Sequence, residues 1–176
     1  LLQNYEDLSF HMIPGNHDPI LSASMSTLPD LRIYEDPEIL DLGPGIAPLL
    51  LIPYRHGTTM GEHIEPFASD LPSNRWYLVS HGDWTGSIQS GNPLEPGVYM
   101  PLTQLDTSSY LPTLVLLGHI HKPLSSGIVH YPGSPCGLDI NETGHRSFIV
   151  LDTDSGLIRR VPVQTDVLYF TETLLA

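Results

Sequence analysis

The sequence predicts a mixed fold of the α+β kind, in which short strands outnumber helices and end in loops that carry polar side chains. Three observations support this class. Apolar runs typical of strands recur along the chain. The 17 Pro and 15 Gly residues leave little room for long helices. A length of 176 residues with 40% apolar and 15% charged residues suits a globular core. We therefore expect a single domain over residues 1–176.

Strands are predicted in both halves of the chain. In the first half they are Phe10 to Pro14, Leu31 to Tyr34, Glu38 to Leu42 and Pro48 to Pro53, with a turn at Gly43-Pro44-Gly45. Two apolar runs that stop at a Gly/His pair are predicted to be buried strands, Trp76 to Ser80 and Thr113 to Leu117. The second half adds Ile128 to Tyr131, Ser147 to Asp152, Leu157 to Val163 and Val167 to Phe170, with a hairpin turn at Asp154-Ser155-Gly156.

Helices are predicted in three places. Pro19 to Thr27 follows Asp18, which can act as the N-cap, with Pro19 at the first helical position. Thr59 to Leu71 and Leu102 to Ser109 are the other two candidates. Between them, Gly86 to Pro101 is rich in Gly, Ser and Pro and predicts a surface loop.

The charge balance limits the classes of partner. Seven Lys and Arg residues against 20 Asp and Glu residues give a net charge of −13, which excludes wrapping of nucleic acid by bulk electrostatics. An acidic substrate would then need a bound metal ion to hold it. The single cysteine, Cys136, excludes an internal disulfide and is compatible with a cytoplasmic location. The apolar stretches are far shorter than the ~20 residues of a membrane span, so no membrane partner is expected.

Histidines mark the ends of two predicted buried strands. His119 and His121 follow the run that ends at Leu117, and if the strand continues their side chains leave the same face. Neutral imidazoles placed in this way are good ligands for Zn, Mn or Fe. The same pair also fits two polar residues exposed at a strand end. His81 repeats the arrangement, since it follows an apolar run and precedes Gly82.

A third junction follows the first predicted strand. Gly15 permits an unusual backbone angle, Asn16 can present its amide oxygen to a cation, and His17 can donate a proton. Three strand-to-loop junctions that end in Asn-His, His and His-x-His predict one shared metal site.

These junctions resemble, in order, the last three signature motifs of the calcineurin-like metallophosphoesterases. The motifs are Gly15-Asn16-His17-Asp18, Ser80-His81-Gly82 and Gly118-His119-Ile120-His121, and Asn16, His81 and His119 are separated by 65 (81 − 16) and 38 (119 − 81) residues. The flanking segments resemble the SbcD-type DNA-repair exonuclease subgroup, and they are His119 to Pro123, Tyr131 to Pro135 and Asn141 to Gly144. The resemblance extends from about Phe10 to Val163.

The resemblance implies a two-sheet β-sandwich flanked by helices, with a two-metal centre of Mn²⁺, or of Fe, Zn or Mg. Asn16, His81 and His119 would bind one ion and His121 the other. His17 would be the catalytic residue that donates a proton to the leaving oxygen or stabilises the transition state. The implied reaction is hydrolysis of phosphodiester bonds in DNA, by a homodimer working with an ATPase of the structural-maintenance type.

The sequence departs from the family in its first residues. The family also uses Asp-x-His and Gly-Asp-x-x-Asp motifs upstream, and Leu1 to Pro14 contain neither. We therefore expect an N-terminally incomplete domain, its C-terminal two-thirds, with residues 164–176 leading toward a capping domain. Without those carboxylates, hard cations should bind poorly, and the isolated chain should be inactive or nearly so.

Two other functions fit the same residues. A phosphatase or nucleotide phosphodiesterase with a small substrate would need no basic surface, as the charge of −13 favours. A non-catalytic phosphoesterase-like scaffold would explain the missing motifs. Among further candidates, His56 and Arg55 after a strand, and Lys122 beside the His pair, are more often structural or exposed than functional.

Overall fold

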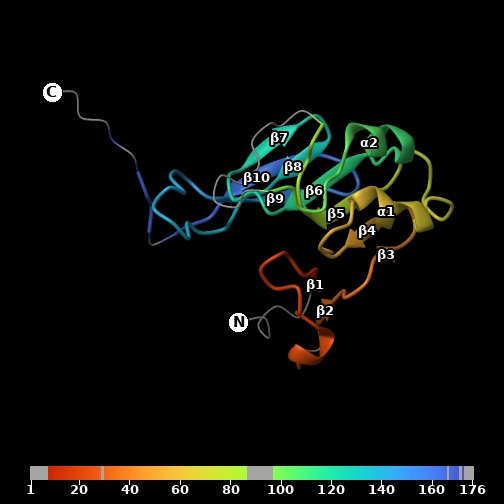
Figure 1. Ribbon diagram of the computed structural model, residues 1–176, viewed down its shortest axis with the longest axis horizontal. Coiled ribbons are helices and arrows are strands. Elements are labelled where there is room, and N and C mark those ends of the chain that lie inside the picture. The colour runs from red at the N-terminus through yellow and green to blue at the C-terminus, as the bar shows by residue number, and fades with distance from the viewer. Residues whose placement is uncertain (1–7, 29, 87–96, 166, 171, 173–176) are drawn as a thin grey trace.

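A mixed sheet of six strands forms the centre of the computed structural model, which describes residues 8–28, 30–86, 97–165, 167–170 and 172 (Figure 1). The strand order is β3-β4-β5-β6-β8-β7. The strands are β3 (Glu38–Leu40), β4 (Leu49–Ile52), β5 (Tyr77–His81), β6 (Leu114–Gly118), β7 (Leu124–Ser126) and β8 (Val129–Tyr131). The four inner strands run parallel, and β3 and β7 pair antiparallel at the two edges. The α+β class is thereby confirmed.

One face of this sheet carries the main core. Leu50, Leu78 and Val115 lie side by side in the register of β4, β5 and β6, and all three are fully buried. They pack with Met60 and Ile64 of α1 (Met60–Ile64). Burying each such side chain contributes about 1.5–3 kcal/mol. The apolar runs of the sequence are therefore explained by a parallel sheet that is buried between layers.

The other face is covered by a hairpin. β9 (Ser147–Leu151) and β10 (Ile158–Pro162) pair antiparallel, and the predicted turn at Asp154-Ser155-Gly156 joins them. Leu151 and Ile158 pack against Tyr77 and Leu114. The central sheet therefore lies between a helical layer and a two-stranded β layer.

Two capping boxes explain where the helices begin. At the start of α1, the Thr59 side chain accepts a hydrogen bond from the Glu62 N–H, and the Glu62 side chain accepts one from the Thr59 N–H. Thr103 and Asp106 form the same pair of bonds at the start of α2 (Gln104–Tyr110). α1 is shorter than predicted, because Pro66 follows it and the chain tightens into the 3-10 turn η3 (Glu65–Phe67).

The predicted helix Pro19 to Thr27 is wrong. Only a 3-10 turn, η2 (Ala23–Met25), forms there. Side chains bind backbone N–H groups here, since Glu35 Oε1 accepts from the Ala23 N–H and the Ser26 hydroxyl accepts from the Leu28 N–H. Side-chain acceptors that satisfy backbone groups in this way compete with helix formation. The predicted strand Val167 to Phe170 is also wrong, since these four residues belong to no sheet, and the three-residue β7 was missed.

A small separate sheet positions the first junction. β1 (Phe10–Met12) and β2 (Leu31–Ile33) pair in parallel. Figure 1 shows them apart from the central sheet. Beyond β1, the carbonyl of Pro14 accepts a hydrogen bond of 3.0 Å from the N–H of Tyr54, which follows β4. This bond ties the loop after β1 to the carboxyl end of the central sheet.

Parts of several predictions fall outside the described residues. They are residues 1–7, most of the predicted loop Gly86 to Pro101, and residues 166, 171 and 173–176 of the segment 164–176. Among the residues that are described, no helix has the length and apolar character that crossing a membrane requires.

Candidate metal centre

The carboxyl ends of β5 and β6 bring two predicted ligands together. His81 pairs in register with Gly118, so His119 follows directly beside it. The rings of His81 and His119 have centroids 5.5 Å apart. His119 has a φ of 95°, a conformation that a residue with a side chain adopts only where the surroundings hold it. β6 therefore ends at Gly118. Since the strand does not continue, His119 and His121 do not project from one face of a strand as predicted.

Asn16 reaches this pair from the first junction. Its Oδ1 lies 2.6 Å from His81 Nε2, although the two residues are 65 apart in sequence. The bond between Pro14 and Tyr54 holds the loop in place for this contact. The structure thus brings together Asn16, His81 and His119, three of the four predicted ligands.

Two glycines make room for the His81 ring. A Cβ atom on Gly15 would lie 2.7 Å from His81 Cε1, and one on Gly118 would lie 2.7 Å from His81 Nδ1. Both distances are shorter than any normal contact, so a side chain at either position would displace the ring. The glycines of the Gly-Asn-His-Asp and Gly-His-Ile-His motifs are therefore needed for close approach to His81, in addition to any need for backbone freedom.

Asp83 adds a carboxylate that the sequence interpretation did not assign to the site. Its Oδ1 lies 3.7 Å from His119 Nε2, and both side chains are less than 10% exposed. Its Oδ2 accepts a hydrogen bond of 2.7 Å from the Tyr99 N–H. The available signal was its place in the chain, two residues after His81 at the end of a buried strand.

The fourth predicted ligand, His121, has a different partner. Its Nδ1 lies 2.5 Å from Glu142 Oε1. Burial alone would raise the pKa of Glu142, but the hydrogen bonds that its carboxylate accepts from His121, Leu138 and Ser134 outweigh burial and lower the pKa. The His121 side chain is 35% exposed, so the ring stays accessible while its Nδ1 edge is engaged.

The predicted catalytic residue His17 follows Asn16 directly and is exposed. Its place next to a predicted ligand suits a group that meets substrate and exchanges protons with solvent. The assignment of His17 as a proton donor stays a prediction.

The donors gathered around His81 fit a divalent ion in type, because amide oxygen and imidazole nitrogen are ligands for Zn, Mn and Fe. Gly15 and Gly118 leave the space that the His81 ring occupies. Within the described part of the chain, no group of three or more His, Cys, Asp or Glu side chains lies close enough to hold an ion. The cluster is therefore a partial donor set, with Asn16 as its third member.

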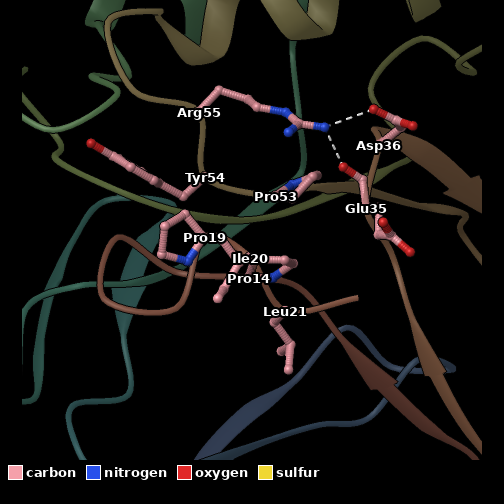
Figure 2. A pocket seen from close by; sticks show the side chains of 9 residues that line it. All are labelled: Pro14, Pro19, Ile20, Leu21, Glu35, Asp36, Pro53, Tyr54 and Arg55. Carbon is pink, nitrogen blue, oxygen red and sulfur yellow. Dashed lines mark hydrogen bonds and ion pairs between the residues drawn. The ribbon is translucent and has the colours of Figure 1, made fainter. Parts of the chain in front are cut away.

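A cavity of about 190 Å³ lies between the segments that follow β1, β2 and β4 (Figure 2). Pro14 and Tyr54 belong to its wall, and the Tyr54 ring also stands edge-on to the His81 ring at 6.1 Å. Arg55 crosses the rim and binds Asp36 at 2.7 Å as well as the Glu35 carbonyl. The guanidinium of Arg55 is therefore engaged by an acidic loop and is not aimed at the His81 cluster.

The other histidines and Lys122 lie in ordinary surroundings. His56 is exposed, 3.4 Å from the Tyr54 hydroxyl, and Lys122 is exposed. His11, His63 and His130 each bond to a hydroxyl group, of Tyr34, Thr58 and Ser125 respectively. Contacts of this kind are typical of packing or surface residues.

No family model and no curated protein matches this chain. The resemblance to the metallophosphoesterases therefore rests on the sequence motifs alone.

Proposed function

We propose that this chain carries the metal-binding residues of a calcineurin-like metallophosphoesterase that hydrolyses phosphodiester bonds, of the SbcD type that acts on DNA. One observation carries the proposal. Three motifs that are distant in sequence meet at one edge of the sheet, with Asn16 Oδ1 2.6 Å from His81 Nε2 and the His81 and His119 rings 5.5 Å apart. The two-sheet sandwich of that family, a homodimer and an ATPase partner belong to the same proposal.

The residues have separate roles in this proposal. Asn16, His81 and His119 hold one divalent ion, and His121 holds the second. Bound divalent ions supply Lewis acidity and neutralise the charge of a phosphoryl group. This explains how a chain with a charge of −13 can hold an anionic substrate.

His17 acts at the leaving oxygen. In the proposed hydrolysis a water molecule forms the new bond to phosphorus and loses a proton to solvent, and His17 donates a proton to the leaving oxygen as its P–O bond breaks. Its exposed position lets it recover a proton from solvent.

A small phosphodiester, such as a cyclic or dinucleotide substrate, is the second candidate. The cavity whose wall includes Tyr54, the neighbour of the His81 ring, favours it, because about 190 Å³ is below the size of typical drug-sized pockets and would take a single flanking group.

The test is hydrolysis by the full chain with Mn²⁺ added. Three substrates are compared: an aryl phosphodiester, linear duplex DNA and a cyclic nucleotide. We expect slow, metal-dependent release that His81→Ala abolishes and His145→Ala, an exposed histidine outside the motifs, leaves unchanged. The preferred substrate decides between the two candidates. Equal rates for the wild-type chain and His81→Ala would refute both and favour a scaffold.

A further inference from the structure

Glu142 makes a short contact to a proposed ligand from another loop. Its Oε1 lies 2.5 Å from His121 Nδ1, and the residues are 21 apart in sequence. The Glu142 side chain is only 9% exposed. A hydrogen bond of this length to a carboxylate is charge-assisted and directional. The orientation of the His121 ring therefore depends on a buried side chain outside the Gly-His-Ile-His motif.

The second oxygen of Glu142 is fully engaged by other donors. Oε2 accepts 3.1 Å hydrogen bonds from the Ser134 hydroxyl and from the Leu138 N–H. Arg146 Nη2 stands 3.5 Å from the same oxygen. With Oε2 occupied in this way, the carboxylate is held with Oε1 toward His121.

Arg146 contacts both His121 and Glu142. It is 4% exposed, its Nη1 donates 2.9 Å to the His121 carbonyl, and its Nη2 donates to the Glu142 carbonyl. Its positive charge balances that of Glu142. Because an ionised carboxylate oxygen only accepts, the contact to Oε1 places a proton on His121 Nδ1.

We propose that Glu142 is a positioning residue for His121: it holds the ring proton on Nδ1 and so leaves Nε2 as the nitrogen that binds a divalent cation. The metal part of this inference rests on the proposed function. Carboxylate partners of this kind fix the tautomer of ligating histidines and raise their basicity. The Asn141-Glu142-Thr143-Gly144 segment thereby gains a role that its sequence alone does not define.

The test begins with the tautomer of His121 in the metal-free chain, measured by two-bond ¹H–¹⁵N spectra of the imidazole nitrogens at neutral pH. The wild-type chain should show protonated Nδ1 and unprotonated Nε2. Glu142→Ala should shift His121 to the Nε2–H tautomer, while Glu142→Gln should retain the wild-type pattern because its amide oxygen still accepts from Nδ1. Ser134→Ala is the matched control, since it removes a donor to Oε2 and leaves Oε1 unchanged.

Titration with Zn²⁺ is the second readout. Glu142→Ala should weaken Zn²⁺ binding by about 10- to 100-fold, and Glu142→Gln should restore most of it. A wild-type chain that binds no Zn²⁺ would overturn the proposed function, while the tautomer would still decide the role of Glu142. A wild-type His121 protonated on Nε2, or an Nδ1–H pattern that persists in Glu142→Ala, would overturn the positioning role. The wild-type spectrum makes this test even if Glu142→Ala does not fold.

Discussion

The two sides of the candidate centre are built in different ways. His81 and His119 stand at the ends of neighbouring strands in the central sheet, and the backbone ladder between β5 and β6 places them. His121 lies beyond the sheet and is held by Glu142 and Arg146, whose side chains arrive from 21 and 25 residues further along the chain. The first side is positioned by backbone hydrogen bonds, and the second by a buried ion pair. Perturbing one side should therefore leave the other largely intact.

Removing Arg146 should have the largest effect on stability. Arg146→Met leaves the Glu142 carboxylate without its buried cation and removes the donors to two carbonyls. Breaking a buried pair in this way costs about 3–5 kcal/mol. Urea unfolding measures the loss, and hydrogen exchange should show it centred on the loops around His121 and Glu142. Equal loss of protection in β5 and β6 would contradict the independence of the two sides.

Adding a methyl group beside His81 should have a smaller effect on stability, and the effect should be centred on the His81 side of the centre. Gly118→Ala would place a Cβ 2.7 Å from His81 Nδ1, which forces the ring away from Asn16. We expect a loss of about 1–3 kcal/mol of stability together with weaker Zn²⁺ binding.

Gly45→Ala is the control for this substitution. Gly45 has a φ of 86° and open space around it, so alanine there brings backbone strain without a clash at the site. This variant should lose stability and keep its Zn²⁺ affinity. Wild-type affinity in Gly118→Ala would show that the His81 ring is not confined as described.

The smallest effect concerns His63, which lies in α1 and outside both sides of the centre. Burial, and after it the positive charge of Arg55, lowers the pKa of His63 below its usual 6.5. The unfolded chain therefore binds a proton more readily, so the contribution of His63 is present above pH 6.5 and is lost as the pH falls below it. His63→Gln should reduce the drop in melting temperature between pH 7 and pH 5. An unchanged drop would show that His63 does not contribute to acid sensitivity.

The sequence predicted the first side of the centre better than the second, for physical reasons. Buried parallel strands are recognised by their apolar runs, here Trp76 to Ser80 and Thr113 to Leu117. Because the carboxyl ends of such strands lie at the same edge of a sheet, the proximity of His81 and His119 could be predicted. The partner of His121 could not be found in this way, because no periodicity connects it to Glu142. The helix expected after Asp18 failed because side chains of Glu35 and Ser26 accept hydrogen bonds from backbone N–H groups in this segment.

Anomalous diffraction from crystals of the chain soaked with Zn²⁺ tests the metal site most directly. We expect a metal peak within bonding distance of Asn16 Oδ1, His81 and His119, with the hydrogen bond between Asn16 and His81 replaced by bonds to the ion. A map in which that hydrogen bond persists at 2.6 Å and the ion binds elsewhere would contradict the proposed site.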